Sequence, residues 1–432
     1  MEKPNVLLVI CHDLGRRLGC YEVDTVQSPN IDRLAGEGIR FSRNFSTAPQ
    51  CSPSRACMMT GRYPHANGMM GLTHGTFGWE MHPEERHIAQ ILSENGYDTV
   101  LSGVQHVTTH PEGLGFKEIL NGRRGTCEDV SDRFCRWLKR RPKTTTPFYA
   151  QVGYFEPHRP FNHGGATPDD SLGVSVPPYL PDCAETRGEL AAMQGVIRKM
   201  DAAFGHILSA LERTGHAEDT LVIFTVDHGI PFPRAKCTLY DPGLTTALIM
   251  RWPRGGIEGG RVCNALISNV DMVPTLLEVL DVAPPDNLQG RSFASCLRGE
   301  PCTHRDEIFA EKTFHTYYDP MRCIRTERYK YIVNFHRGYR MEVPTDVQKG
   351  GTYRAMLDEI SGGRPDFELY DLETDPNETE NLAGKPGLEE VEADLRRRLH
   401  AWMAGTGDPL LAGPVSSPTS LRVRGQLQSG RH

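Results

Sequence analysis

The chain has 432 residues, a formal net charge of -7 and an isoelectric point near 6.2. Because globular domains usually hold about 100–200 residues, we expect two unequal domains rather than one compact core. A negative net charge gives no excess of positive charge to attract nucleic acid or an anionic membrane, so neither is expected as a partner. No apolar run approaches the roughly 18–20 residues that cross a bilayer. An anionic ligand would therefore have to be held locally, by a metal ion and a few well-placed cations.

The first residues and the cysteines bear on the cellular compartment. No signal-peptide pattern of a basic, then apolar, then cleavable segment precedes the first expected strand, which predicts a cytoplasmic protein. Twelve cysteines in such a chain predict free thiols in a reducing compartment. The sequence has no Cys-x-x-Cys pair, so a structural zinc site is not expected.

Strands and helices are expected to alternate from the N-terminus onward. Residues 5–11 form a continuous apolar run, which indicates a strand buried on both faces of a mainly parallel sheet. A helix is expected over 55–59, directly behind Cys51, so that Cys51 lies at a helix N-terminus, where backbone N–H groups favour an anion. The other elements expected in this part are helices over 28–37 and 88–95 and a strand over 97–102.

The same alternation continues through the middle of the chain. The elements expected there are a strand over 148–155, a long helix over 187–214, a second doubly buried strand over 220–226 and a helix ending over 276–280. This order points to a three-layer α/β sandwich with a mainly parallel central sheet. Charged residues and glycines fall where the strands end, and sites in open α/β sheets lie outside the carboxyl ends of the strands. The functional residues are therefore expected at that edge.

The pattern changes after about residue 300. Residues 306–311, 321–325 and 329–334 alternate as antiparallel strands do, and a helix is expected over 388–402. We therefore expect a catalytic domain over residues 1–300 and a smaller C-terminal α+β domain with an antiparallel sheet over 301–412. The tail over 413–432 is rich in Ser, Pro, Gly and Arg, which predicts disorder.

The most informative stretch begins at Cys51, which opens the run Cys-Ser-Pro-Ser-Arg and is followed by Thr-Gly-Arg at 60–62. An isolated cysteine is commonly an inert core residue, but this run resembles the C-x-P-S-R…T-G-R element of the sulfatase family. In that family the cysteine is oxidised to formylglycine by a maturase. One hydroxyl of the hydrated aldehyde attacks sulfur, and the second expels the sulfate by restoring the aldehyde. The resemblance implies an alkaline phosphatase-like fold, a formylglycine nucleophile made from Cys51 and a maturase as a partner.

Candidate metal ligands follow two of the expected strands. His12 and Asp13 follow the first strand, and Asp227 and His228 follow the strand over 220–226. Carboxylate oxygens suit Ca²⁺ or Mg²⁺, whereas imidazoles shift the preference toward Mn²⁺ or Zn²⁺. The resemblance implies that these residues, together with Cys51, hold one divalent cation, with Ca²⁺ expected first and Mg²⁺ or Mn²⁺ as alternatives. His12 stands where the family commonly has an aspartate, so it is either a ligand or a neighbour of the ligands.

The resemblance assigns the remaining catalytic roles by position. Arg55 would brace the nucleophile and the metal-bound oxygens, a task that suits a planar guanidinium. His106 would hydrogen-bond the nucleophile, but Val104 stands where relatives have a sulfate-binding lysine. His158, in a Pro-His element, would protonate the leaving group. Lys236 would contact the sulfate and the leaving oxygen.

Shorter runs are similar to the heparan N-sulfatase branch of the family, notably Gly-Ile-Pro-Phe-Pro over 229–233 and Pro-Met-Arg over 320–322. The resemblance implies an N-sulfated amino sugar such as N-sulfoglucosamine as substrate, with Arg322 bordering the sugar. We therefore expect a metal-dependent sulfatase that hydrolyses a sulfate ester or sulfamate of a small sulfated sugar. A phosphodiester or phosphonate monoester hydrolase that uses the same modified cysteine is the first alternative. A catalytically decayed binding protein is the second, because Val104 and His12 depart from the common pattern.

Overall fold

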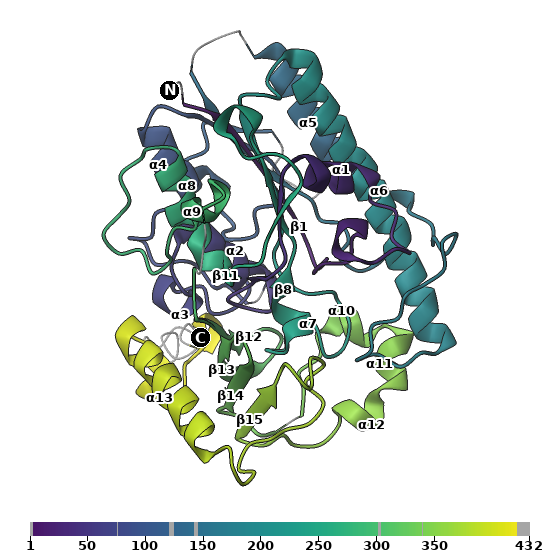
Figure 1. The fold of residues 1–432 in the computed structure, drawn as a ribbon, viewed down its shortest axis with the longest axis vertical. Coiled ribbons are helices and arrows are strands. Elements are labelled where there is room, and N and C mark those ends of the chain that lie inside the picture. The colour runs from purple at the N-terminus through teal and green to yellow at the C-terminus, as the bar shows by residue number, and fades with distance from the viewer. Residues whose placement is uncertain are drawn as a thin grey trace, which may run out of the picture.

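The computed structural model describes residues 3–75, 77–120, 125–141, 146–300, 304–338 and 340–420. At its centre is an eight-stranded sheet with the strand order β10-β2-β9-β7-β1-β6-β4-β5 (Figure 1). The four neighbouring parallel strands in its middle are β7 (Thr220–Val226), β1 (Asn5–Cys11), β6 (Phe148–Gly153) and β4 (Asp98–Gly103). The other strands of this sheet are β2 (Ile39–Phe41), β5 (Glu118–Ile119), β9 (Leu248–Arg251) and β10 (Arg261–Cys263). The mainly parallel central sheet is thereby confirmed, although β9 runs antiparallel to both of its neighbours.

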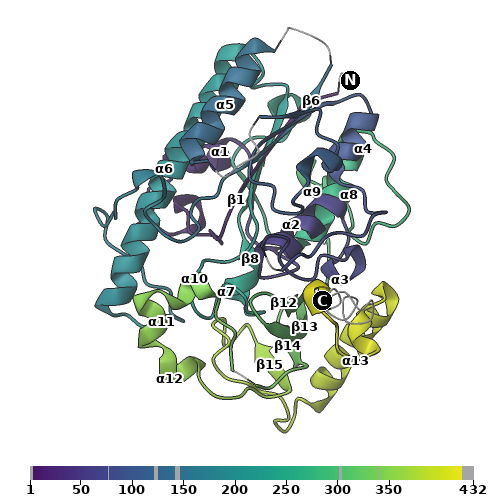
Figure 2. The same ribbon diagram turned by 180° about the vertical axis from the view of Figure 1, so that it is seen from behind.

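Helices cover both faces of this sheet (Figures 1 and 2). One layer contains α1 (Pro29–Glu37), α5 (Cys127–Arg140) and α6 (Ala184–Thr214). The other layer contains α2 (Cys51–Thr60), α4 (Ile88–Glu94), α8 (Met272–Val279) and α9 (Ala294–Leu297). Alternate residues of β1 pack into opposite layers: Leu7 and Val9 join the α5–α6 core, whereas Val6 and Leu8 join the α2–α8 core. A strand buried on both faces needs the continuous apolar run that the sequence shows.

Most of the predicted elements are present, with boundaries that differ by a few residues. The strands predicted over 5–11, 220–226 and 329–334 have the observed bounds. The long helix begins at Ala184 rather than at residue 187, and the helix behind the nucleophile motif begins at Cys51 itself. Helix α5, which is amphipathic and buries Val130 and Phe134, was not among the predicted elements.

A separate four-stranded antiparallel sheet lies at the C-terminal end of the fold and is drawn at the bottom of Figure 1. It contains β12 (Glu307–Phe314), β13 (Tyr318–Thr326), β14 (Tyr329–Asn334) and β15 (Phe367–Asp371). Helix α13 (Glu389–Thr406) packs on it, and α10 (Thr345–Gln348), α11 (Gly351–Ala355) and α12 (Leu357–Ile360) lie between β14 and β15 in the chain. The antiparallel sheet that the sequence predicts after residue 300 is thereby confirmed.

The remaining elements of the described residues are short. A three-stranded sheet contains β3 (Asn44–Phe45), β8 (Thr245–Thr246) and β11 (Ile267–Ser268). The short helices are α3 (Pro64–Asn67) and α7 (Asp241–Leu244). The 3-10 turns are η1 (Gly19–Tyr21), η2 (Pro111–Leu114), η3 (His163–Gly165), η4 (Pro253–Gly255), η5 (Asn269–Asp271) and η6 (Pro409–Leu411).

The four-stranded sheet shares a hydrophobic core with helix α2. Trp402 of α13 stacks on Phe309 of β12, with ring centroids 4.9 Å apart, and meets Tyr63 edge-on at 4.9 Å. Cys57 of α2 belongs to the same buried cluster. Aromatic contacts of this kind add to the area that they bury. The helix that starts at Cys51 is therefore packed directly against the C-terminal part of the fold.

The structure differs from the sequence-based expectations at one cysteine and in part of the tail. Ten described cysteines are free thiols, but Cys296 is disulfide-bonded, so the expectation of free thiols is wrong at that position. The expectation followed from the absence of a signal-peptide pattern, which describes the chain as a whole and does not determine the state of an individual cysteine. Of the predicted tail, residues 421–432 lie outside the described residues, whereas Val415 donates its backbone N–H to the Tyr318 hydroxyl at 3.1 Å. In the described part of the chain, no helix is both long enough and apolar enough to cross a membrane.

A fully buried ion pair holds β13 to the segment after α13. Arg322 donates from Nε to Asp408 Oδ2 at 2.5 Å and from a terminal nitrogen to Asp408 Oδ1 at 3.0 Å. Its other terminal nitrogen donates to the backbone carbonyls of Lys312 and Met321, both at 2.9 Å. Arg322 is 0% exposed, so its guanidinium is occupied within the fold.

We expect Arg322→Met to lower the free energy of unfolding by about 3–5 kcal/mol, because it leaves the Asp408 charge buried without its partner. Urea denaturation would measure the loss. Arg328→Met is the matched control, since Arg328 pairs with Asp371 but its side chain is 51% exposed, and it should leave stability nearly unchanged. Equal effects of the two substitutions would contradict the structural role of Arg322.

Candidate active site

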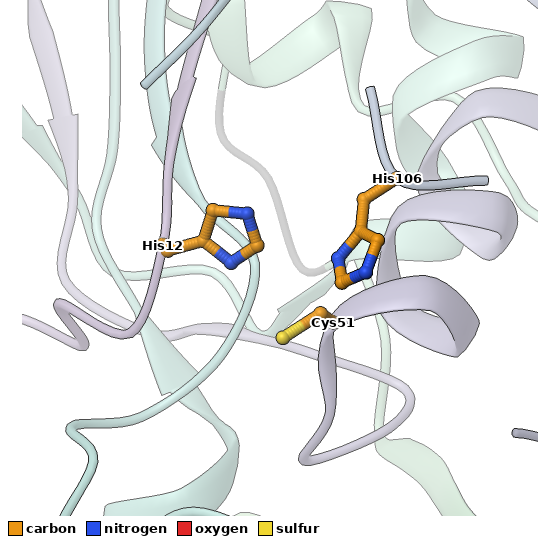
Figure 3. A group of neighbouring side chains, drawn as sticks. All are labelled: His12, Cys51 and His106. Carbon is orange, nitrogen blue, oxygen red and sulfur yellow. The ribbon is translucent and has the colours of Figure 1, made fainter. Parts of the chain in front are cut away.

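The carboxyl ends of the four central strands converge on one cluster of polar side chains. Asp13 follows β1, Asp227 follows β7, His106 follows β4 and His158 follows β6. Cys51 enters the cluster from the N-terminus of α2. Figure 3 shows the rings of His12 and His106 and the Cys51 side chain pointing toward one another, and these three offer ligand atoms within 4.8 Å of each other. The edge of the sheet that the sequence predicts is therefore the place where the candidate residues meet.

Asp227 is the most connected residue of the cluster. Its Oδ1 accepts the backbone N–H groups of Asp13 at 3.0 Å and of His228 at 2.9 Å. Its Oδ2 accepts Nε of Arg55 at 2.9 Å and lies 3.0 Å from Nδ1 of His12. Burial opposes the charge of this carboxyl, but His228, His12 and Arg55 outweigh it and hold its pKa well below the usual range. Asp227 is therefore ionised, and Arg55 is fixed by it.

Asp13 joins the cluster to a buried lysine. Its Oδ2 accepts Nζ of Lys236 at 2.8 Å, and its Oδ1 lies 3.1 Å from Nε2 of His228. Asp13 is fully buried, which opposes its charge, yet Lys236, His158 and His228 hold its pKa well below the usual range. Asp13 therefore carries its charge at neutral pH.

The orientation of the His228 ring follows from one hydrogen bond. Its Nδ1 lies 3.0 Å from the carbonyl oxygen of Gly229, and because a carbonyl only accepts, Nδ1 carries a proton. Nε2 is then turned toward Asp13 and toward the Cys51 sulfur, which is 3.3 Å away. A neutral His228 would therefore present a lone pair from Nε2 to a metal ion between these groups.

Cys51 itself is 2% exposed. Burial raises the pKa of its thiol, although Lys236 and His228 act in the opposite direction. Since a thiolate is the reactive form of cysteine, this environment keeps the unmodified side chain weakly nucleophilic. Its place at the first turn of α2 puts it beside backbone N–H groups that favour an anion.

The donors around Cys51 fit a divalent cation. His12, Asp13, Cys51 and Asp227 each offer an atom within 4.8 Å of the others, and His228 adds Nε2. Burial and the Arg55 cation lower the pKa of His12 to about 3, so its imidazole is neutral. Nδ1 of His12 faces Asp227 at 3.0 Å, whereas its buried Nε2 makes no hydrogen bond. A buried neutral imidazole beside two ionised carboxylates is the donor chemistry that a metal ion uses.

A second group of side chains surrounds Lys236. Its Nζ donates to Asp13 at 2.8 Å and to Oδ2 of Asp346 at 3.1 Å, and it lies 3.2 Å from Nε2 of His158. Nδ1 of His158 is 2.6 Å from the carbonyl oxygen of Arg159 and therefore carries a proton. Burial and Lys236 lower the pKa of His158. Asp346, on the first turn of α10, was not among the predicted site residues, since nothing in a short polar segment marks it.

His106 has a neighbour that the sequence did not reveal. Its Nε2 lies 2.7 Å from Nδ1 of His74, and the two rings stack with centroids 4.8 Å apart. His106 adopts a φ of 62° and Asp13 a φ of 51°, a left-handed backbone that costs of order 1 kcal/mol in a non-glycine residue. The fold therefore turns both side chains into the cluster at some cost in backbone strain.

One of the expected contacts is absent from the cluster. Arg322 is turned into the core and bound to Asp408, so the prediction that it borders the substrate is wrong. On a strand, neighbouring side chains face opposite ways, and a resemblance of three residues does not settle which way Arg322 faces. Val104, at the position of the usual lysine, contributes its carbonyl, which accepts from Arg55 at 3.4 Å.

A large hollow of the described surface lies elsewhere. It has a volume of about 1170 Å³ and includes Arg43, Arg261 and Arg398 in its lining. None of the site residues named above lines it, and Arg43 and Arg398 pair with Glu327 and Glu307. The candidate active site is therefore the buried cluster at the strand ends rather than this hollow.

The comparisons with known proteins agree with this geometry. The sulfatase family profile matches residues 4–282, and a profile described as "N-sulphoglucosamine sulphohydrolase, C-terminal" matches residues 232–352. The chain is 30% identical to human N-sulphoglucosamine sulphohydrolase over 466 aligned positions, which cover 95% of this chain and 92% of the relative. An ulvan-active sulfatase of Formosa agariphila is 27% identical over 94% of this chain and 76% of its own length. The chain belongs to the sulfatase family and is a sulfuric ester hydrolase.

Solved structures with the same fold include enzymes of two activities. A protein solved in complex with its substrate D-glucosamine-2-N,6-O-disulfate has a TM-score of 0.72 and 20% identity, over 94% of this chain and 98% of that one. The phosphonate monoester hydrolase of Agrobacterium radiobacter has a TM-score of 0.70 and 23% identity, over 95% and 97%. At these identities the likeness shows the fold alone. The alkaline phosphatase-like sandwich is thereby confirmed.

Proposed function

We propose that this sulfatase hydrolyses the N–S bond of N-sulfoglucosamine or a closely related sulfated amino sugar, with formylglycine made from Cys51 as its nucleophile. The observation that carries the proposal is the placement of Cys51 at the start of α2, with its sulfur 3.3 Å from His228 and 3.9 Å from Asp13. The 30% identity to N-sulphoglucosamine sulphohydrolase along 95% of the chain supports the substrate.

The modification gives residue 51 a function that its thiol lacks. Once formed, a hydrated formylglycine supplies two hydroxyl groups on one carbon, one to attack sulfur and one to expel sulfate. The conversion needs access of a maturase to a residue that is 2% exposed in the folded chain. The motif is therefore proposed to be read before the chain folds completely.

The chain's own residues divide the remaining tasks. Lys236, bound to Asp13, and Arg55, bound to Asp227, would neutralise the oxygens of the sulfo group as charge grows on them. His158, with its proton fixed at Nδ1, has Nε2 facing Lys236 at 3.2 Å, and this nitrogen would take a proton and deliver it to the leaving nitrogen. His106 would hold a hydroxyl of the modified residue 51, with its ring oriented by His74.

We propose that Asp13, Asp227, His228, His12 and residue 51 hold one divalent cation. Bound there, the ion would supply positive charge to the sulfo group and orient it. The carboxylates suit Ca²⁺, the ion expected from the sequence. The two imidazoles among the donors favour Mn²⁺ over Ca²⁺, and we propose that Mn²⁺ is held more tightly.

A phosphodiester or phosphonate monoester hydrolase is the second candidate function. The observation behind it is Val104, which stands where relatives have a sulfate-binding lysine and so departs from the sulfatase pattern. A sulfamate and a phosphodiester each carry one negative charge, so charge alone does not separate them. The two candidate functions must therefore be distinguished by the leaving group that the site accepts.

Cys51 should be found as formylglycine when the chain is produced together with a maturase. Mass spectrometry of the peptide over 51–55 would show loss of the thiol and an aldehyde that reacts with a hydrazide. Cys51→Ala should keep the fold and lower kcat by roughly a thousandfold or more. Efficient turnover by a preparation that contains only cysteine at position 51 would refute the nucleophile.

Asp227→Asn should lose the bound metal, because it removes one ligand charge and weakens the hold on Arg55 and His12. Elemental analysis after dialysis should fall from about one ion per chain to a small fraction of that. Asp358→Asn, which removes an exposed carboxylate from α12, is the control and should keep full occupancy. Competition between Mn²⁺ and Ca²⁺, followed by thermal shift, tests the choice of ion. Full occupancy in Asp227→Asn would eliminate the site as described.

Competing assays at equal concentration should show sulfate release from N-sulfoglucosamine exceeding hydrolysis of bis(4-nitrophenyl) phosphate. Each tenfold difference in kcat/KM is about 1.4 kcal/mol of transition-state preference. A tenfold preference in the opposite direction would assign the enzyme to the second candidate function.

A further inference from the structure

We propose that Asp346 is a specificity-determining residue that recognises the nitrogen of the leaving group, so that the site prefers N-sulfates over O-sulfates. The inference rests on the proposed function and names a residue outside the motifs that identify the family. Asp346 places a carboxylate beside Lys236, the lysine proposed to bind the anion, and a negative charge is unexpected at an anion-binding site.

The position of Asp346 is defined by two contacts. Its Oδ2 lies 3.1 Å from Nζ of Lys236 and 3.6 Å from Nε2 of His158. Burial opposes its charge, but Lys236 and His158 lower the pKa of Asp346 to about 2. Asp346 is therefore an anion that touches both the sulfate-binding cation and the candidate proton donor.

Exposure shows on which side of the site Asp346 lies. The side chains of Asp13 and Lys236 are 0% and 1% exposed, whereas those of His158 and Asp346 are 19% and 23% exposed. The sulfo group must reach the deep end, because Cys51 and Lys236 are there. The sugar must then lie toward the outer end, where His158 and Asp346 border the opening.

A carboxylate at this place is unfavourable for an anion and favourable for a cation. Like charges within a few ångströms repel, and the repulsion is strongest where water is excluded. Placed near an incoming sulfo group, Asp346 would weaken binding unless some other part of the substrate gains from it. The leaving nitrogen of an N-sulfate is such a part.

The charge change of the reaction differs between the two classes of substrate. An N-sulfate reacts as R–NH–SO₃⁻ + H₂O → R–NH₃⁺ + SO₄²⁻: the N–S bond breaks, its electron pair stays on nitrogen, and nitrogen gains two protons. An O-sulfate reacts as R–O–SO₃⁻ + H₂O → R–OH + SO₄²⁻ + H⁺, and its leaving group stays neutral. Only the first reaction develops a cation beside Asp346. A fixed carboxylate aimed at developing positive charge stabilises that transition state selectively.

The contact between Asp346 and Lys236 would also offset the repulsion between Lys236 and a cationic product. An ammonium product formed near Lys236 would be repelled by it, and Asp346 lies against Lys236 at the side where the product leaves. An anionic sulfo group that binds Lys236 would compete with Asp346 for that cation. Asp346 would then be freed to accept the N–H group of the leaving nitrogen.

The test compares two substrates that differ only in the bridging group, N–H or O: N-sulfoglucosamine and glucose 2-sulfate. Asp346→Asn, in the full chain matured at Cys51 and loaded with metal, should lower kcat/KM at least about tenfold for the N-sulfate and less than about threefold for the O-sulfate. The ratio of the two values does not depend on the folded fraction, because both substrates meet the same active molecules. Asp358→Asn is the control for loss of one carboxylate and should leave the ratio unchanged.

An equal loss on both substrates would overturn the proposal and reduce Asp346 to a residue that positions Lys236 and His158. Product inhibition gives an independent readout: Asp346→Asn should weaken inhibition by glucosamine about tenfold and leave inhibition by glucose unchanged. If the wild-type enzyme hydrolyses only O-sulfates, the proposed substrate class fails, while the comparison of glucosamine with glucose still decides whether Asp346 recognises an amine.

Discussion

The buried carboxylate of Asp227 is the interaction on which the rest of the site depends. It accepts hydrogen bonds from the backbone at Asp13 and His228 and from Arg55, and thereby joins the ends of β1 and β7 to helix α2. A buried charge without its partners costs several kcal/mol, so these groups cannot rearrange independently. The same constraint fixes Arg55 against the strand ends and sets the distance between Cys51 and the candidate metal ligands.

The two parts of the fold contribute differently to this site. The central sheet supplies the deep residues at the ends of four parallel strands, where the sulfo group would bind. The segment that follows β14 supplies the partly exposed Asp346, on the side where the leaving group would lie. The stack of Trp402 on Phe309, in the core shared with α2, keeps the C-terminal part in place relative to the nucleophile. A change of leaving-group preference could therefore arise in the C-terminal part without disturbing the nucleophile.

The sequence predicts that the deep residues of the cluster lie close together, because local rules determine where they are. Continuous apolar runs mark β1 and β7, and the first polar residues after them, Asp13 and Asp227, must lie at one edge of the sheet. The contact between Asp346 and Lys236 cannot be predicted from local rules, because Asp346 lies 110 residues further along the chain on a four-residue helix. The prediction for Arg322 was wrong because a short motif specifies only the residue type. Its position opposite Glu311 and its ion pair with Asp408 depend on tertiary structure.

The most direct measurement is a crystal structure of Cys51→Ala, which should turn over only very slowly, soaked with N-sulfoglucosamine and Mn²⁺. The account predicts the sulfo group beside residue 51 and Lys236, the metal between Asp13, Asp227 and His228, and the sugar nitrogen facing His158 and Asp346. A sugar bound with its nitrogen turned away from Asp346 would contradict the leaving-group assignment. A sulfo group bound outside the cluster at the strand ends would contradict the account of the active site as a whole.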